Sequence, residues 1–401
     1  MSAELPDTVG LRTAAVHAGE SPDPATNAAS PHIVMSTTYV VDQPVPFSAM
    51  DREDGEQPFV YTRWGNPTVR QLERKLAALE GAEDGRAYAS GMAAISALLF
   101  SRLSSGDRVV VSDVAYPGTA ELARHTLRRM GIEVVLVDTS DLAAVRTALE
   151  TPAALVWLES PANPIMRLTD IEAVAEVAHE AGADVAVDST FATPVATRPL
   201  ELGADYVVHS LTKYIGGHGD ALGGAVLGSA DRMAAIDLEA TVHYGGVISP
   251  FNAWLVMRGA ATLPIRMAAH EAGALAVAEA LENHPAVLRV MFPGLESHPQ
   301  HELARRQMAC FSGMLTFQVE DGEAVALRMM KELRVVHYAV SLGHHRSLVY
   351  WLPTDTLMES TYRLEGDQLA AYRSYAGDGV FRLSVGLEDP ADLVEDLLAV
   401  L

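Results

Sequence analysis

The sequence predicts an α/β fold in which a mostly parallel sheet is flanked by helices and followed by a smaller α+β domain. Two observations support this prediction. Short Val-rich runs recur between residues 108 and 227, and helical patterns lie between most of them, as in βαβ units. Beyond residue 260 this alternation stops, and a long helical pattern precedes two further strand candidates.

The individual elements follow in order from the same patterns. Residues 1–60 have many Pro, Ser and Asp residues and few periodic segments, which predicts an irregular arm that wraps another surface. A helix that begins at an Asn is predicted over residues 66–79, because apolar residues recur there at helical spacing. Strands are predicted at 108–112, 133–138, 154–159, 184–188, 205–209 and 224–227. Helices are predicted at 93–102, 119–130, 141–149, 169–181 and 263–283, and late strands at 313–319 and 381–385.

The composition excludes several classes of function. The chain of 401 residues has a formal net charge of −23, which leaves no basic patch to neutralise nucleic-acid phosphates. Its single cysteine, Cys310, allows neither a disulfide framework nor a thiolate metal site, and a reducing compartment fits. Residues 1–20 contain no apolar segment, and the apolar stretch 92–100 is too short to span a membrane. We therefore expect a cytoplasmic enzyme or binding protein without a metal, nucleic-acid or membrane partner.

The stretch 207–220, VVHSLTKYIGGHGD, is the feature around which the chemistry is organised. Lys213 follows an apolar run typical of the end of a buried strand. Burial lowers the pKa of a lysine, which favours a nucleophile that forms a Schiff base with a carbonyl cofactor. Ser210 and Thr212 would suit the phosphate of such a cofactor. From this stretch alone, a surface lysine in a glycine-rich turn remains the alternative.

Other polar residues follow predicted strands at the carboxyl edge, where ligands bind in open parallel sheets. Ser90, Gly91 and Met92 precede the predicted helix 93–102, so backbone amides at the helix start could hold a phosphate, or Ser90 could be an ordinary helix cap. Asp188 ends an apolar run and would pair with a protonated pyridine nitrogen, or cap the following loop. Asn163 could donate to a ring hydroxyl, or form a simple turn with its neighbouring prolines.

Three further candidates lie outside these positions. Tyr116 could stack on a flat cofactor ring and move protons, or pack in a turn. Tyr61 and Arg63 form a pair that suits a phosphate dianion, or lie on the surface. Arg382 interrupts an apolar strand-like run, where it would bind a substrate carboxylate or reach solvent at a sheet edge.

Together these motifs resemble the cystathionine γ-synthase/γ-lyase family of Cys/Met-metabolism enzymes, which depend on pyridoxal 5′-phosphate (PLP). They occur in the family order over nearly the whole chain, and the combination is specific although each motif is weak alone. The matching motifs are Tyr61-Thr62-Arg63-Trp64-Gly65-Asn66-Pro67-Thr68, Ser90-Gly91-Met92-Ala93-Ala94, Glu159-Ser160-Pro161 with Asn163-Pro164, Asp188 with Thr190-Phe191-Ala192-Thr193-Pro194, Ser210-Leu211-Thr212-Lys213-Tyr214, Ser249-Pro250 with Arg258-Gly259, Ser341-Leu342-Gly343, and Arg382-Leu383-Ser384-Val385-Gly386.

The resemblance implies the PLP-dependent, aspartate-aminotransferase-like fold (fold type I) and a role for each motif. Lys213 would carry PLP as a Schiff base, Asp188 would pair with the ring nitrogen, and Tyr116 would stack on the ring. The residues implied to hold the phosphate are Gly91, Met92, Ser210 and Thr212, with Tyr61 and Arg63 from a neighbouring subunit. The residues implied to hold the substrate carboxylate are Arg382, Ser341 and Asn163.

The resemblance also implies how the chain is organised. Residues 1–64 would form an N-terminal arm that contributes to the neighbouring subunit's site, residues 65–260 the PLP-binding domain, and residues 261–401 the C-terminal α+β domain. The assembly implied is a homotetramer built as a dimer of catalytic dimers, acting on a small amino-acid substrate.

The far end of the implied pocket departs from the family pattern. Two glutamates of cystathionine-cleaving members are replaced by Val60 and Val340, and an arginine position falls near Glu121. Gly118 stands where methionine γ-lyases often have a cysteine. The stretches 344–346 and 350–365 replace the usual Pro-x-x-x-Thr-His run. The sequence leaves open whether Glu121, His344, His345 and Arg346 line the pocket.

These observations predict γ-elimination from a γ-substituted L-amino acid of the methionine, O-substituted homoserine or canavanine type, which releases the γ-group. γ-Replacement, as in a cystathionine γ-synthase or an O-acylhomoserine sulfhydrylase, is the alternative, because both reactions share every cofactor contact. A PLP-binding protein without turnover is disfavoured, because Lys213, Asp188, Tyr116 and Arg382 are retained together. Cystathionine should be a poor substrate, since an apolar lining would leave its distal ammonium unpaired.

Overall fold

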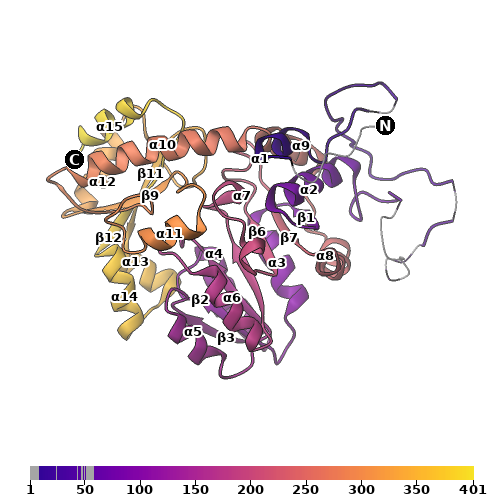
Figure 1. Cartoon of the computed structure of the whole chain (residues 1–401), viewed down its shortest axis with the longest axis horizontal. Coiled ribbons are helices and arrows are strands. Elements are labelled where there is room, and N and C mark those ends of the chain that lie inside the picture. The colour runs from indigo at the N-terminus through magenta and orange to yellow at the C-terminus, as the bar shows by residue number, and fades with distance from the viewer. Residues whose placement is uncertain (1–8, 24, 43, 47, 49, 51–57) are drawn as a thin grey trace.

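The computed structural model describes residues 9–23, 25–42, 44–46, 48, 50 and 58–401, and it contains two β-sheets. The larger sheet has seven strands and the smaller sheet has five. Figure 1 shows the long helix α10 (Leu263–Glu282) running along one side of the molecule, from the region of the larger sheet to that of the smaller one. Among the described residues, no helix combines the length and the apolar character needed to cross a lipid bilayer.

The larger sheet contains every strand that the first part of the sequence predicts. Its strands, in spatial order, are β1 (Asp84–Tyr88), β7 (Gly224–Gly228), β6 (Tyr206–His209), β5 (Asp184–Asp188), β4 (Leu155–Glu159), β2 (Arg108–Ser112) and β3 (Glu133–Val137). The strands from β6 to β3 are parallel, while β7 is antiparallel to both of its neighbours. The sequence did not indicate β1, because its residues, DGRAY, lack an apolar run.

Helices cover both faces of this sheet because its central strands are apolar on both sides. On one face, Val109 and Trp157 pack with residues of α3, and on the other, Val110 and Val156 pack with α5 and α6. The helical segments of this part are α2 (Pro67–Glu80), α3 (Gly91–Arg102), α4 (Pro117–Glu121), η2 (Leu122–Leu127), α5 (Leu142–Leu149), α6 (Ile171–Glu180), α7 (Thr193–Ala196), η3 (Pro199–Leu202), α8 (Ala230–Ile236), η4 (Asp237–Tyr244) and α9 (Pro250–Ala260).

Helix α2 begins and ends as its sequence predicts. The Asn66 side chain accepts hydrogen bonds from the amides of Thr68 and Val69, which satisfies two of the free donors of the first turn. Pro67 occupies the first helical position, where its missing N–H costs nothing. The helix ends at Gly81, whose φ of 74° is the left-handed conformation that glycine adopts readily.

The N-terminal segment contains a helix that the sequence did not indicate. Residues Leu11–His17 form α1, which packs on α2 and buries Ala14 and Ala15. The amino group of Lys75, fully buried in α2, donates to the Ala15 carbonyl at 2.6 Å and pairs with Glu20 at 3.0 Å. The expectation of an irregular segment is therefore wrong over these residues. A helix of seven residues is too short for a clear periodic signal and depends on this tertiary contact.

The smaller sheet belongs to the second part of the chain. Its strands, in spatial order, are β10 (His337–Tyr338), β11 (Leu348–Pro353), β12 (Gly379–Ser384), β9 (Met314–Val319) and β8 (Val287–Met291). The predicted late strands correspond to β9 and β12, whereas β8, β10 and β11 were not predicted. The remaining helical segments are α11 (His301–Gln307), α12 (Gly322–Glu332), α13 (Thr354–Leu357), η5 (Met358–Tyr362), α14 (Gly366–Ala376) and α15 (Pro390–Leu398).

Candidate active site

The carboxyl edge of the larger sheet gathers the ends of three parallel strands. Glu159 ends β4 and Asp188 ends β5, and the two residues are register partners. β6 lies next to β5 and leads through His209 into the loop that carries Lys213. Parallel strands present their carboxyl ends at one edge, so residues far apart in sequence meet there.

Lys213 lies in this loop with its amino group largely shielded from water. Its Nζ donates a hydrogen bond to Oγ of Ser341 at 3.0 Å, which joins the loop after β6 to the segment before β11. Burial, helped by the positive charge of Arg382, lowers the pKa of Lys213 to about 8. A larger fraction of this amine is therefore neutral near neutral pH than for an exposed lysine, which suits a nucleophile.

Asp188 is held by Thr190, which belongs to a family motif but was not predicted as a site residue. The backbone N–H and the hydroxyl of Thr190 both donate to Oδ1 of Asp188, at 3.1 and 2.6 Å. The same hydroxyl oxygen accepts from the Ser210 amide at 2.9 Å, so Thr190 fixes the acid relative to the lysine loop. A hydroxyl two residues after a carboxylate is a recognisable local hydrogen-bonding pattern, and it was a usable signal.

Burial raises the pKa of Asp188, because a desolvated carboxylate is costly to keep charged. Such a group stays ionised when a cation lies against it. A protonated pyridine nitrogen is a cation of the required kind, so the chemistry of Asp188 fits the ring of PLP.

Glu159 is a second buried carboxylate, and it organises two of the predicted residues. It accepts from the backbone amides of Tyr116 at 2.6 Å and of Asn163 at 2.9 Å. Burial and the nearby Asp188 raise the pKa of Glu159 well above its ordinary value. Glu159 was not predicted as a site residue, although it ends an apolar strand just as Asp188 does.

The start of α3 meets the loop after β6 and fits a phosphate. The Ser90 hydroxyl accepts from the Ala93 amide at 3.1 Å, which caps the helix. A Cβ on Gly91 would lie 2.8 Å from Oγ of Ser210, so only glycine allows this close approach. Amides at a helix start together with a serine hydroxyl form a suitable anion site. The Thr212 hydroxyl contacts the backbone of Gly223 instead, at 3.1 and 3.2 Å.

Met92 also borders this region. A Cβ on Gly118 would lie 2.7 Å from the Met92 sulfur and 2.7 Å from the ring of Tyr116. The Tyr116 ring therefore lies close to the start of α3, and it is 43% exposed, which leaves one side open to a flat ligand.

The three residues expected at a substrate carboxylate meet beside Lys213. The Arg382 guanidinium donates to Oδ1 of Asn163 at 2.9 Å and to the Ser341 carbonyl at 3.3 Å. Burial lowers the pKa of Arg382, which still leaves it charged at neutral pH. The hydroxyl of Tyr362, which the sequence analysis did not single out, lies 2.9 Å from the Asn163 carbonyl oxygen and supports the loop.

Tyr61 and Arg63 do not join this constellation within one chain. The Arg63 guanidinium lies 5.4 Å from the centre of the Tyr61 ring and donates to the Val242 carbonyl at the end of η4. Tyr61 is 46% exposed. The hydrogen bonds described for this pair do not reach Lys213, Asp188 or Ser210.

The sequence left open whether Glu121, His344, His345 and Arg346 line the pocket, and the structure gives each of them different surroundings. Nε2 of His344 lies 3.3 Å from Oγ of Ser341, next to Lys213. The amide of the following residue, His345, donates to the Gly217 carbonyl, and its ring faces His218 at 5.8 Å. Arg346 is exposed. Glu121, at the end of α4, accepts from the Thr361 hydroxyl at 3.3 Å. It therefore lies against the stretch 350–365, which departs from the family pattern.

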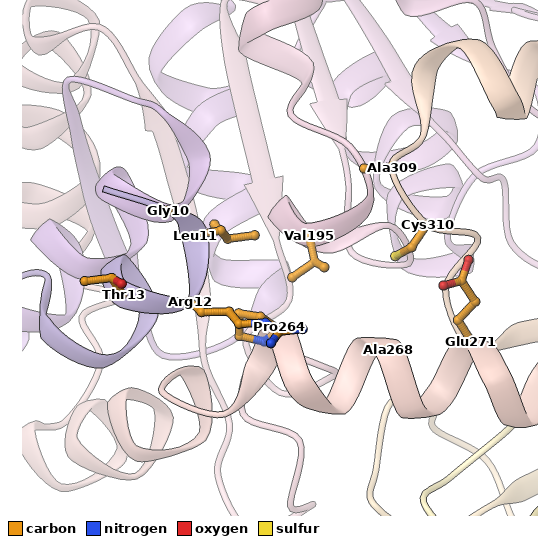
Figure 2. A pocket seen from close by; sticks show the side chains of 10 residues that line it. All are labelled: Gly10, Leu11, Arg12, Thr13, Val195, Pro264, Ala268, Glu271, Ala309 and Cys310. Atoms are coloured by element: carbon orange, nitrogen blue, oxygen red, sulfur yellow. The ribbon is translucent and has the colours of Figure 1, made fainter. Parts of the chain in front are cut away.

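A separate cavity of about 460 Å³ lies away from these residues, between α1, α7, α10 and the chain near Cys310. Figure 2 shows Arg12 and Glu271 at opposite ends of this cavity, with Val195 and Cys310 between them. Burial raises the pKa of the Cys310 thiol to about 11, so the thiol stays protonated at neutral pH and is a poor nucleophile. None of the predicted site residues lines this cavity.

Comparison with known proteins gives similarity along nearly the whole chain. A family model described as "Cys/Met metabolism PLP-dependent enzyme" matches residues 12–401. The chain is 42% identical to a canavanine γ-lyase of Pseudomonas canavaninivorans, over 98% of this chain and 96% of that protein. It is 46% identical to an O-succinylhomoserine sulfhydrylase of Pseudomonas aeruginosa, over 87% and 85% of the two chains. A solved cystathionine γ-synthase of Xanthomonas oryzae pv. oryzae, in complex with cystathionine, superposes with a TM-score of 0.88 at 37% identity, covering 98% and 97% of the two chains.

Proposed function

Because the chain belongs to the Cys/Met-metabolism family of PLP-dependent enzymes, we propose that it catalyses γ-elimination from a γ-substituted L-amino acid that carries no distal ammonium group. Family membership confirms three expectations from the sequence: the chain is an enzyme, its cofactor is PLP, and its fold is the aspartate-aminotransferase-like fold type I.

The residues that would hold PLP come from three loops at the carboxyl edge of the larger sheet. Lys213 would bind the cofactor covalently, Asp188 would face the pyridine nitrogen, and the start of α3 with Ser210 would receive the phosphate. When bound, PLP withdraws electrons from the substrate α-carbon, which makes protons on the α- and β-carbons acidic and allows the γ-group to depart.

The protein's own groups bind the substrate and move its protons. Arg382, oriented by Asn163, would pair with the substrate carboxylate in a bidentate contact. The neutral amine of Lys213 would accept the α-proton at Nζ, because its lowered pKa keeps part of the amine unprotonated. Tyr116, on the open side of the site, would donate a proton to the departing γ-group.

The proposed substrate class rests on two valines that the family resemblance assigns to the far end of the pocket. Val60 and Val340 stand where carboxylates would pair with a distal ammonium, and a buried unpaired charge is costly. Methionine or an O-substituted homoserine avoids that cost. Canavanine becomes a substrate if Glu121 reaches its guanidinooxy group, because a carboxylate matches a guanidinium in a two-pronged contact. The similarity to a canavanine γ-lyase supports this option.

γ-Replacement remains a second candidate, supported by the similarity to an O-succinylhomoserine sulfhydrylase. In that reaction a thiol adds where elimination would release the carbon skeleton as a 2-oxo acid. The two reactions use the same residues at the cofactor and differ in whether a nucleophile reaches the γ-carbon.

A panel of substrates tests the proposal. Methionine, canavanine, cystathionine and acylhomoserines, each with and without a thiol, are assayed for 2-oxo acid and ammonia, with Lys213→Ala as the inactive control. We expect cystathionine to have a specificity constant at least about tenfold below the best substrate. Glu121→Gln should lower kcat/KM for canavanine alone if Glu121 binds the guanidinium. Cystathionine as the best substrate would contradict the proposal, and product formation only in the presence of a thiol would favour replacement.

We also propose a homotetramer of two catalytic dimers, a three-part division of the chain at residues 64/65 and 260/261, and a cytoplasmic location. The shared site is supported by the position of Tyr61 and Arg63, whose described contacts leave them outside their own chain's constellation. The cytoplasmic location is supported by the single cysteine, because a chain without disulfides suits a reducing compartment.

A further inference from the structure

A chain of hydrogen bonds leads from the amine of Lys213 towards the surface. Nζ of Lys213 lies 3.0 Å from Oγ of Ser341, and the same Oγ lies 3.3 Å from Nε2 of His344. The serine hydroxyl both donates and accepts, so it can connect an amine with an imidazole. Since His344 is only partly buried, the chain ends at a group that exchanges protons with solvent.

Two glycines allow the segment of Ser341 and His344 to pack closely against the loop of Lys213. Gly343 has a φ of +72°, and a Cβ on it would lie 2.5 Å from the Tyr214 amide nitrogen. The segment that contains Gly343 therefore packs directly against the loop of Lys213. Gly219 also has a φ of +72°, and a Cβ there would lie 2.8 Å from the His344 ring. Both positions require glycine, and together they allow the imidazole to lie against the loop of Lys213. Ser341 itself adopts a φ of 84°, which is unusual for a residue with a side chain and aims its backbone at this site.

The charges around His344 favour its neutral form. Burial lowers the pKa of His344, and Lys213, His345 and Arg346 add positive charge, while Asp220 acts in the opposite direction. A neutral imidazole has one nitrogen free to accept a proton, which is the state that a proton acceptor needs.

We propose that His344 is a positioning residue that acts through Ser341 as the proton acceptor for Lys213 whenever Nζ forms a bond to a carbonyl carbon. The proposal rests on the proposed function, because it assumes that Lys213 is the residue that binds PLP. As the N–C bond forms, an Nζ proton moves to Oγ of Ser341 while the hydroxyl proton moves to Nε2 of His344. Both protons of the neutral amine finally leave with the carbonyl oxygen as water, and His344 returns to its neutral form.

The attachment of PLP to the cofactor-free protein tests this directly, because it requires no amino-acid substrate. Its rate is followed by visible absorbance between pH 6 and 9 in the wild type, His344→Gln, His344→Ala and Ser341→Ala. Glutamine can still contact the serine but does not titrate. We expect the rate at pH 7 to fall on the order of tenfold in both His344 variants and in Ser341→Ala. Added imidazole should restore the rate of His344→Ala and leave that of Ser341→Ala low, because the serine link is missing there.

His345→Gln is the matched control, since this neighbouring histidine contacts Gly217 and His218 and not Ser341. Its rate and pH profile should equal those of the wild type, and melting temperatures check that every variant folds. An unchanged rate in His344→Gln overturns the proposal, and so does a slow His344→Ala that imidazole fails to rescue, because that loss would be structural. If the wild type itself bound no PLP covalently, the proposed function would fail instead.

Discussion

At the scale of single residues, burial sets the proton affinities that matter for chemistry. Burial lowers the pKa of Lys213 and raises those of Asp188 and Glu159, and in each case desolvation is the largest cause. The nearest charges modify these effects without reversing them. Burial also lowers the pKa values of two histidines outside the candidate site, His270 and His298. Their effect can be measured as a change in the free energy of unfolding with pH.

Acid should destabilise the protein through these two histidines. Burial lowers the pKa of each from 6.5 to about 4, so between those values the unfolded chain binds protons that the native chain does not. The free energy of unfolding is therefore fully retained above pH 6.5 and falls as the pH drops towards 4, by about 3 kcal/mol for each residue. Urea unfolding of wild type and His270→Asn at pH 7 and pH 4.5 measures this effect.

The variant should be less stable than wild type at pH 7 but should lose less of its stability on acidification. His337→Asn serves as the control, because His337 is exposed and its replacement should leave the pH dependence as it is in the wild type. Equal pH dependence in wild type and His270→Asn would mean that burial does not control the titration of His270.

At the scale of elements, a single arginine joins α10 to the loop of Lys213. The buried Arg266 guanidinium donates to the carbonyls of Tyr214, Ile215 and Gly259, at 2.7, 3.2 and 2.8 Å. The Gly259 carbonyl, near the end of α9, also accepts from the amide and hydroxyl of Thr262. The carbonyls of Tyr214 and Ile215 lie in the turn after Lys213, where the arginine replaces the missing secondary-structure donors. Burial lowers the pKa of Arg266 to about 10, which leaves it charged at neutral pH.

Arg266→Met should therefore destabilise the fold and loosen the loop that carries Lys213. Leaving the buried carbonyls of Tyr214 and Ile215 without donors costs about 2 kcal/mol or more, since each unsatisfied group loses its hydration without replacement. The melting temperature and the rate of PLP release from the holoenzyme are the measurements. Arg305→Met, at a side chain 63% exposed on α11, is the matched control and should change neither. A normal melting temperature in Arg266→Met would show that the loop holds its shape without this contact.

At the scale of the whole molecule, one chain brings together most of the predicted site residues, but not Tyr61 and Arg63. The lysine, the acid and the residues proposed to bind the substrate carboxylate meet within a single chain. The Arg63 guanidinium contacts η4 instead, and it lies 5.4 Å from the centre of the Tyr61 ring. We propose that Tyr61 and Arg63 complete the site of a second copy of the chain.

Subunit complementation tests that arrangement. Arg63→Ala and Lys213→Ala should each be nearly inactive alone, whereas a mixture of the two should recover up to about a quarter of the wild-type activity, because some dimers then hold one intact site. Activity of the mixture after subunit exchange is the measurement, with each variant mixed with itself as the control. If exchange is demonstrated and no activity returns, the two residues act within their own chain.

The sequence by itself determined the elements whose signal is local. The central strands were predictable because apolar runs buried on both faces look alike in any parallel sheet, and α2 was predictable from the cap at Asn66 and the period of its apolar residues. Lys213, Asp188 and Arg382 stood out because a charge beside an apolar run must have a partner. In each of these cases the pattern that allowed the prediction lay within a few consecutive residues.

Only the tertiary structure decided features that depend on partners distant in the chain. The edge strand β1 exists because β7 offers it hydrogen bonds, and α1 exists because Lys75 and the surface of α2 bury it. In the same way, Thr190 contacts Ser210 and Ser341 contacts Lys213, across gaps of 20 and 128 residues. No local pattern encodes such contacts, because their free energy is gained only when the folded backbone brings the two groups together.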